Sequence, residues 1–166
     1  IPCLNEETTI ANVVETFSKA LPNSTIYVFD NKSTDKTVEA ATRAGAIVRS
    51  VRKRGKGNVV REMFRQIRAD AYVIVDGDST YPADAVHELL KPILDGEVHM
   101  TVGDRISSRA YTQQNNRPFH HTGNNLITYL INFFFRARCR DVLSGYRAFS
   151  RAFVETTPIM SGGMNY

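Results

Sequence analysis

The chain has 166 residues, of which 42% are hydrophobic, 23% are charged and two are Cys. This length and composition fit one domain with a hydrophobic core, and they exclude a disulfide-stabilised miniprotein, a disordered tail and a large multidomain assembly. The net charge of +4 is unevenly spread. Residues 1–100 carry 13 Lys and Arg against 14 acids, whereas residues 101–166 carry eight Arg, no Lys and three acids. Cys3 and Cys139 have neither metal-ligand spacing nor a disulfide pattern, so we expect a reducing compartment.

Strand-like and helix-like patterns alternate over the first hundred residues. Short β-branched and aromatic runs predict four strands, over residues 25–29, 46–51, 71–75 and 99–102. Apolar residues at helical spacing, or a capping sequence, predict helices between them, over residues 10–21, 35–44, 60–67 and 86–93. The strands are apolar throughout rather than at every second position. This order therefore predicts an α/β fold, with a mostly parallel sheet and helices on both faces.

The alternation ends after Gly103. The longest apolar segment, Leu126–Phe135, is too short to cross a bilayer, which needs about 20 apolar residues. Two interpretations stay open: a core helix, or an interfacial helix attracted to anionic headgroups by the Arg residues of segment 136–140. No signal peptide is visible. The chain lacks an initial Met and finishes in a loop-like segment, so we expect it to be one domain truncated at both ends.

Every predicted strand is followed by polar residues. In open α/β sheets, ligands bind beyond the carboxyl ends of the strands, so these residues mark the expected site. The segments that follow the strands, in chain order, are Pro2–Glu7, Asp30–Asp35, Arg52–Asn58, Asp76–Pro82 and Gly103–Arg105.

The Asp76-Gly77-Asp78 segment is the most specific of these features. Two carboxylates at alternate positions can converge on one hard cation, and Mg²⁺ or Mn²⁺ bound in this way commonly shares substrate phosphate oxygens. The competing interpretation is an ordinary turn and helix cap before Pro82. The buried strand before the segment, and the polar strand ends beside it, favour the metal site.

Two further strand ends have both a functional and a structural interpretation. Asp30 can accept hydrogen bonds from a nucleobase or ribose, although it also lies in the N-cap region of the next helix. Arg54–Gly57 is a basic, glycine-flanked loop that opens a helix, and it suits either a diphosphate or a solvated turn. His120 and His121 are adjacent, a spacing unlike that of a zinc pair, so we interpret them as acceptor-site or surface residues.

Taken together, these segments resemble family 2 glycosyltransferases with the Rossmann-like GT-A fold. The motifs that carry the resemblance are Pro2–Glu7, Asp30–Thr37, Gly55–Asn58, Asp76–Asp78 and Ser144–Arg147. The C-terminal part resembles the polyprenyl-phosphate subgroup, which includes the dolichol-phosphate mannosyl- and glucosyltransferases. Its matching elements are Gly103–Arg105, Arg117 and Asp141–Arg147. Asn31 replaces the family's second Asp, and Thr80 replaces the Gln of mannosyltransferases, so the sugar is left unassigned.

The resemblance implies an inverting transfer of a hexose from a UDP- or GDP-linked donor, assisted by Mg²⁺ or Mn²⁺. Asp76 and Asp78 would hold the cation, with Asp78 as the main ligand. Residues 1–103 would form the nucleotide-sugar half and residues 104–166 the acceptor half of one catalytic domain. The implied donor-binding residues are Pro2, Leu4, Asn5, Glu6, Asp30, Asn31, Ser33, Lys56, Gly57, Asp76, Gly77 and Asp78.

The implied acceptor is a polyprenyl or dolichyl phosphate at the cytoplasmic face of a membrane. Its phosphate would be bound by Arg105, Arg117, His121 and Arg147. Asp104 and Asp141 are the candidates for a general base, should one be needed. The alternative is a family 2 enzyme acting on a sugar hydroxyl, a reaction that requires such a base. A nucleic-acid-binding domain is less consistent with the sequence, because aromatics are not interleaved with the Arg residues and the acidic strand ends would repel phosphate in the absence of a metal.

Overall fold

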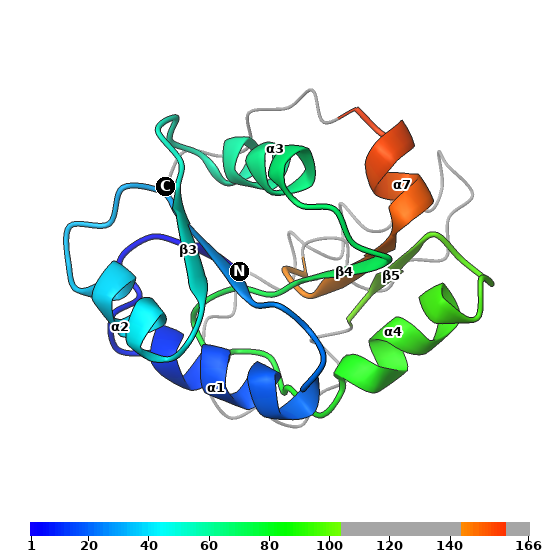
Figure 1. Ribbon diagram of the computed structural model, residues 1–166, viewed down its shortest axis with the longest axis horizontal. Helices are drawn as coiled ribbons and strands as arrows, with labels where there is room; N and C mark the ends of the chain where they lie inside the picture. The colour runs from blue at the N-terminus through cyan, green and yellow to red at the C-terminus, as the bar shows by residue number, and fades with distance from the viewer. Residues whose placement is uncertain (104–143, 159–166) are drawn as a thin grey trace, which may run out of the picture.

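The structure, a computed structural model, describes residues 1–103 and 144–158 (Figure 1). Strands and helices alternate as predicted, and most predicted boundaries hold to within two residues. The helix α3 begins four residues before its apolar stripe, because Lys56, Gly57 and Asn58 form a polar first turn. The elements are β1 (Pro2–Cys3), α1 (Ile10–Ala20), β2 (Tyr27–Asp30), α2 (Thr37–Arg43), β3 (Ile47–Ser50), α3 (Lys56–Gln66), β4 (Ala71–Ile74), α4 (Val86–Leu94), β5 (Met100–Val102), β6 (Arg147–Ser150) and α7 (Arg151–Thr156).

The strands form two three-stranded sheets. The first has the order β1-β2-β3 and is parallel, with Pro2 opposite Phe29 and Tyr27 opposite Ile47. The second has the order β4-β6-β5, and β6 runs antiparallel to both of its neighbours. The α/β class and the parallel pairing of the first strands are confirmed. The reversed central strand of the second sheet was not predicted, since apolar periodicity marks a strand without giving its direction.

Helices cover both faces of the sheets, and each face has its own core. α1, α2 and α4 pack on one face, and α3 and α7 pack on the other (Figure 1). Neighbouring residues of one strand divide between the two cores: Val28 joins the first and Phe29 the second, and Ala148 and Phe149 divide in the same way. This arrangement explains why the strands are apolar at successive positions.

The helix α2 begins after a polar capping residue and ends before a glycine, much as the sequence predicts. Asp35 accepts hydrogen bonds from both the backbone N–H and the hydroxyl of Thr37, the first residue of the helix. Gly45 follows the helix with φ of +97°, a conformation that glycine adopts at little cost. The segment 33–35 thus serves the helix start through Asp35, while Ser33 bonds elsewhere.

None of the helices in the described ranges, 1–103 and 144–158, combines the length and apolarity needed to cross a bilayer. The apolar segment Leu126–Phe135, for which two interpretations were open, lies outside those ranges.

Asn31 fixes the loop between β3 and α3. Its side chain is fully buried, and its amide nitrogen donates to the carbonyls of Val51 and Lys53 at 3.1 and 2.9 Å. Its amide oxygen accepts from the N–H of Gly55 at 2.8 Å. Both amide hydrogens are therefore used within the protein. The side chain holds the loop that leads to Lys56, and a contact between Asn31 and the nucleotide stays a prediction.

We expect Asn31→Ala to lower the free energy of unfolding by about 3 kcal/mol, since each buried polar group left unpaired costs roughly 1–3 kcal/mol. Urea denaturation of the chain measures the change, and Asn23→Ala on an exposed turn is the matched control. Equal stability of the two variants would contradict the proposed clamp.

Candidate active site

Five segments meet at one edge of the fold. Four follow the carboxyl ends of β1, β2, β3 and β4. The fifth, Ser144–Tyr146, precedes β6 and reaches the same edge because that strand runs antiparallel to β4. The predicted convergence of polar strand ends is therefore confirmed for the described residues.

The loops after β1 and β2 are tied to one another. The backbone N–H of Asn5 donates to Ser33 Oγ at 2.9 Å, and the N–H of Thr34 donates to Asn5 Oδ1 at 2.8 Å. The backbone N–H of Glu6 donates to Thr37 Oγ1 at 2.8 Å. Asn5 and Ser33, both predicted donor-site residues, thus bind each other and fix the relative positions of the two loops.

Asp30 is the last residue of β2 and is almost completely buried. One carboxylate oxygen accepts from the N–H of Lys32 at 3.2 Å, and the other accepts from the N–H of Ser33 at 3.1 Å. The carboxylate therefore shapes its own loop, and binding of a nucleoside by Asp30 stays a prediction. Of the other predicted donor residues, Pro2 is buried in β1 and Leu4 is half-buried directly after it.

Backbone strain is concentrated at this edge. Among the described residues, three that are not glycine have positive φ: Asn5 at +58°, Lys32 at +70° and Ser79 at +59°. They lie in the loops after β1, β2 and β4 respectively. Such conformations persist only where the surroundings impose them, and they are typical of functional sites.

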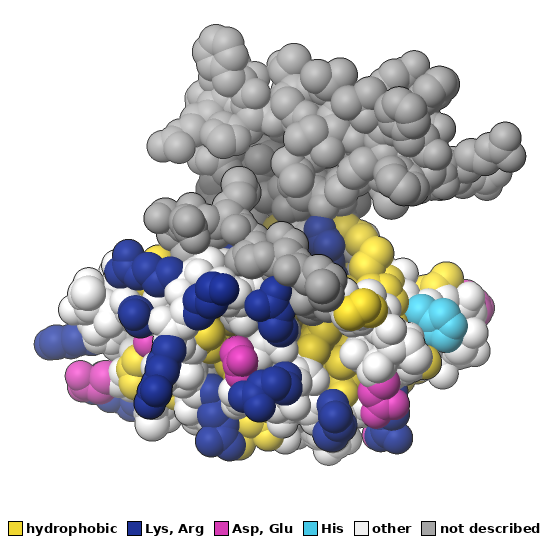
Figure 2. All heavy atoms as spheres, turned by 90° about the horizontal axis from the view of Figure 1, so that it is seen from above, with side chains coloured by type: hydrophobic (Ala, Val, Ile, Leu, Met, Phe, Trp, Pro, Cys, Tyr) yellow, Lys and Arg dark blue, Asp and Glu magenta, His cyan; other side chains and the backbone are white. Residues whose placement is uncertain are grey.

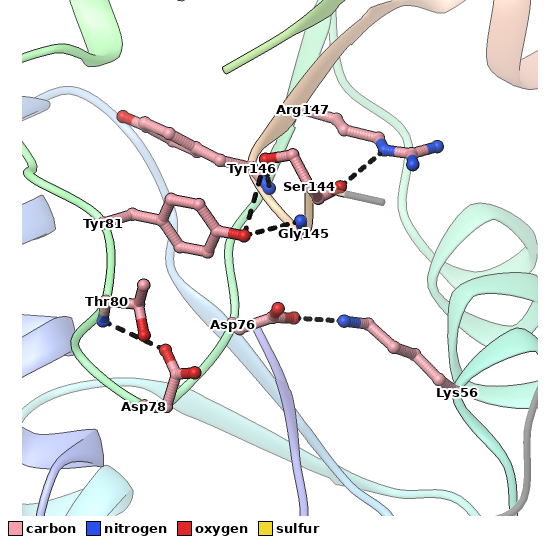
Figure 3. Close-up of polar contacts among 9 residues, drawn as sticks. All are labelled: Lys56, Asp76, Asp78, Thr80, Tyr81, Ser144, Gly145, Tyr146 and Arg147. Atoms are coloured by element: carbon pink, nitrogen blue, oxygen red, sulfur yellow. Dashed lines mark hydrogen bonds and ion pairs between the residues drawn. The ribbon is translucent and has the colours of Figure 1, made fainter. Parts of the chain in front are cut away.

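The Asp76-Gly77-Asp78 segment lies in the centre of this edge (Figure 3). Asp76 Oδ1 pairs with Lys56 Nζ at 2.5 Å, which brings the start of α3 to the end of β4. Asp78 is exposed, and its Oδ1 accepts from the N–H of Thr80 at 3.0 Å. A Cβ on Gly77 would lie 2.8 Å from Cys3 Sγ, so only glycine lets this turn pack on β1. Burial raises the pKa of the Cys3 thiol to about 12, which makes Cys3 a packing residue rather than a nucleophile.

Glu6 adds a third carboxylate beside the same turn. Its Cγ lies 3.4 Å from where a Cβ of Gly77 would be. Burial raises the pKa of Glu6, and the carboxylates of Asp78 and Asp76 raise it further, while a hydrogen bond from Thr9 acts in the opposite direction. A cation at this turn would relieve the mutual repulsion of the three carboxylates.

The donor chemistry of the turn fits a hard divalent cation. Asp76 and Asp78 supply carboxylate oxygens, and Mg²⁺ and Mn²⁺ are commonly held by one or two carboxylates together with substrate phosphates. Within residues 1–103 and 144–158, no cluster of three His, Cys, Asp or Glu residues forms a complete protein-only metal site. A cation here would therefore need ligands from a bound diphosphate or from water.

The first turn of α3 adds positive potential to this edge. Gly55, with φ of +113°, turns the chain into the helix, whose first two residues are Lys56 and Gly57. The unpaired N–H groups at a helix start favour an anion, and the Lys56 ammonium strengthens that preference. The arrangement suits the predicted diphosphate contact of Lys56 and Gly57.

The segment before β6 packs directly on the aspartate turn (Figure 3). The N–H of Gly145 donates to the Tyr81 hydroxyl at 2.7 Å, and both groups are buried. A Cβ on Gly145 would lie 1.9 Å from Asp76 Oδ2, so the glycine backbone lies against that carboxylate. Arg147, a predicted acceptor-phosphate residue, donates through Nε to the carbonyl of Ser144 at 2.9 Å.

Sequence reasoning did not identify Tyr81 as a site residue. A signal was present, because Tyr81 follows the aspartate turn by three residues and precedes Pro82. The spacing does not reveal that its hydroxyl meets Gly145, 64 residues later in the chain. The remaining predicted residues lie outside the described ranges and stay predictions: Asp104, Arg105, Arg117, His121 and Asp141.

We expect Gly145→Ala to destabilise the chain by at least about 1–3 kcal/mol, the usual cost of forcing an extra methyl group into a packed site. The clash is with Asp76, so the cost should be smaller in an Asp76→Ala background. Urea denaturation of the two single variants and the double variant measures the coupling. An equal cost of Gly145→Ala in both backgrounds would show that Asp76 is not the contacted group.

The raised pKa of Glu6 predicts a pH dependence of stability. A carboxyl group that holds its proton more tightly when folded stabilises the fold below its unfolded pKa. That stabilisation is lost as the pH rises through the folded pKa. As the pH rises from the ordinary Glu value of 4.5, the wild type should therefore lose stability relative to Glu6→Gln. Thermal unfolding across this range tests the prediction, with Glu15→Gln on the exposed face of α1 as the control. A stability difference independent of pH would contradict it.

Comparison with known proteins agrees with this geometry. Glycosyl transferase family 2 matches residues 1–157. Protein RfbJ of Shigella flexneri is 49% identical over 105 residues, which cover 63% of this chain and 81% of that protein. Low-salt glycan biosynthesis hexosyltransferase Agl6 of Haloferax volcanii is 34% identical, covering 100% of this chain and 41% of its own length. Dolichyl-phosphate hexose transferase of the same organism is 29% identical, covering 89% of this chain and 63% of that protein.

A solved structure matches the fold as well as the sequence. Glucosyl-3-phosphoglycerate synthase from Mycobacterium tuberculosis, in complex with Mn²⁺, uridine-diphosphate and phosphoglyceric acid, has a TM-score of 0.73 and 25% identity. The match covers 92% of this chain and 54% of that protein. The chain thus spans less than two thirds of the length of that enzyme and of the two Haloferax relatives. The family match nevertheless extends over nearly all of its residues, and the chain belongs to glycosyl transferase family 2.

Proposed function

We propose that this domain transfers a hexose from a nucleotide diphosphate sugar to a lipid-linked phosphate with the help of Mg²⁺ or Mn²⁺. The observation that carries the proposal is the ion pair of Lys56 with Asp76, in the same turn that carries the exposed Asp78. One ammonium and two carboxylates at a helix start suit a diphosphate with its cation.

The donor half would comprise residues 1–103. The tied loops after β1 and β2, which contain Asn5, Asp30 and Ser33, would hold the nucleoside. The start of α3 and the aspartate turn would hold the diphosphate. The similar Mycobacterium tuberculosis enzyme was solved with Mn²⁺ and uridine-diphosphate, which favours a UDP-sugar over a GDP-sugar as the first donor to test.

The two aspartates would have different tasks. Asp78 is exposed, so its carboxylate can reach a cation on the ligand side of the turn. Asp76 lies between Lys56 and Gly145, so it would orient the Lys56 ammonium towards the diphosphate while contributing charge to the cation. A divalent cation held there would neutralise the charge that develops on the leaving diphosphate.

The acceptor half would comprise residues 104–166 and bind a phosphate. Arg147 lies at the same edge as the aspartate turn, and Arg105, Arg117 and His121 complete the proposed set. The forked, permanently charged guanidinium group of arginine suits phosphate recognition. The relative named dolichyl-phosphate hexose transferase supports a polyprenyl-type acceptor. Such a lipid would place the domain at a membrane, and we expect it at the cytoplasmic face.

A second acceptor class is supported by another relative. Agl6 is named as a hexosyltransferase of glycan biosynthesis, and its similarity covers the whole of this chain. An acceptor hydroxyl on a sugar would need a general base, and Asp104 and Asp141 would be the candidates. The two acceptor classes are separable by assay, because they give a lipid-soluble and a water-soluble product respectively.

We expect Asp78→Asn to lower the transfer rate by about a hundredfold or more, since it weakens the hold on a cation that offsets leaving-group charge. The assay follows radiolabelled hexose from UDP- or GDP-hexose into polyprenyl phosphate, with Mn²⁺ present, by organic extraction. Asp95→Asn, on an exposed helix end far along the chain, is the matched control.

Near wild-type transfer by Asp78→Asn would overturn the cation assignment. Label that appears only in a water-soluble glycan acceptor would replace the lipid phosphate by a sugar hydroxyl, and the base candidates would then be tested next.

A further inference from the structure

Positive charge is concentrated in one internal segment. Residues 43–68 contain nine Lys and Arg residues and a single acid, Glu62, which gives the segment a net charge of +8. Because the whole chain is only +4, the remaining residues together carry −4. A division of the chain at residue 100 conceals this charge, because residues 1–42 and 69–100 carry net charges of −3 and −6 that offset the +8 of the segment. The nine cations are Arg43, Arg49, Arg52, Lys53, Arg54, Lys56, Arg61, Arg65 and Arg68.

The fold presents this charge on one flank. Within the described residues β3 is an outer strand of its sheet, and the loop after it leads into α3. We define the β3–α3 basic surface as Arg49, Arg52, Lys53, Arg54, Arg61 and Arg65. Five of these side chains are exposed, and Arg61 is half-buried. Viewed from the α3 side, the described part of the molecule shows many Lys and Arg side chains and few acids (Figure 2).

The surface has a hollow of about 360 Å³ between the end of β3 and α3. Four of its lining residues are the cations Arg52, Lys53, Arg61 and Arg65. Glu62 is the one acid in the lining, and it pairs with Arg65 at 2.7 Å. The core residues next to the hollow are buried, since Val51 and Val59 are 3% and 0% exposed. The loop and the helix that carry the cations are thus anchored in the core at Val51 and Val59.

The basic surface borders the candidate active site. Asn31 holds the loop 51–55 at three points, and the next residue, Lys56, reaches Asp76. Any partner bound to the basic surface would therefore lie beside the aspartate turn.

The chemistry of the surface favours a layer of phosphate groups over a nucleic acid. Phe64 is the one aromatic residue between residues 43 and 68, and it is buried in the core. The surface therefore lacks the exposed rings on which single-stranded bases stack. Ile47 on β3 is the one large apolar side chain exposed between residues 43 and 68, and a single such residue indicates adsorption by charge rather than insertion.

We propose that the β3–α3 basic surface adsorbs to an anionic membrane surface and so holds the aspartate turn beside the bilayer. This inference rests on the proposed lipid-linked acceptor, which would reside in that bilayer. It assigns membrane contact to the donor half, separately from the Arg-rich segment 136–140.

The test compares vesicle binding of two variants that lose the same charge. Arg49→Gln/Arg52→Gln/Lys53→Gln alters the basic surface, whereas Lys19→Gln/Lys36→Gln/Lys91→Gln alters exposed positions outside it. Flotation uses vesicles of phosphatidylcholine alone and vesicles that also contain phosphatidylglycerol, without donor or acceptor. Thermal unfolding checks that both variants are folded.

We expect the wild type to bind only the vesicles with phosphatidylglycerol, and to bind them less at high salt. The basic-surface variant should bind about a hundredfold more weakly, because each basic side chain at an anionic surface contributes roughly fivefold. The control variant should lose much less of its binding to these vesicles.

Equal losses of binding in the two variants, or no binding by the wild type, would overturn the proposal. Binding to a mixed-sequence RNA without binding to anionic vesicles would also overturn it. Since the vesicles contain no substrate, such a failure would leave the transfer assay as a separate test of the enzyme function.

Discussion

The Asp76 carboxylate is the contact on which the rest of the site depends. One of its oxygens is paired with Lys56 at the start of α3, and the other lies against the backbone of Gly145 before β6. Three segments that are far apart in the chain are therefore positioned by one side chain. Because the Asp76 carboxylate is held from both sides, its orientation is fixed. The backbone of the turn that carries Asp78 is thereby held in place as well.

Buried polar side chains hold the loops around Asp76 in place. Asn31 secures the loop that carries Lys56, and Tyr81 accepts the hydrogen bond of Gly145. Each is satisfied by backbone groups of a distant loop, so removing either would leave a buried donor without its partner. The strained residues Asn5, Lys32 and Ser79 lie in the loops between these supports. Stability and pre-organisation of the site thus come from the same few hydrogen bonds.

Much of the fold and part of the site could be predicted from local sequence. Apolar spacing and a capping sequence located the helices, and β-branched and aromatic runs located β2 to β5. The polar strand ends located the edge where the loops meet. The direction of β6 could not be predicted, because pairing between Ala71 and Ser150 is a long-range property. Asn31 presents a similar case, because its place after a strand does not reveal that its amide holds the loop that leads to Lys56. The basic surface was not predicted for another reason. When charges are summed over residues 1–100, the positive charge of Arg52 and its neighbours is cancelled by acids elsewhere in that range.

We propose that the aspartate turn and the start of α3 form one binding site for a diphosphate and its cation. The most direct measurement is a calorimetric titration of UDP into the chain, first with Mn²⁺ and then with a chelator in its place. We expect binding that is at least about tenfold tighter with Mn²⁺, because two carboxylates facing a diphosphate need a cation between them. UDP binding of equal strength in the two conditions, or none in either, would contradict it.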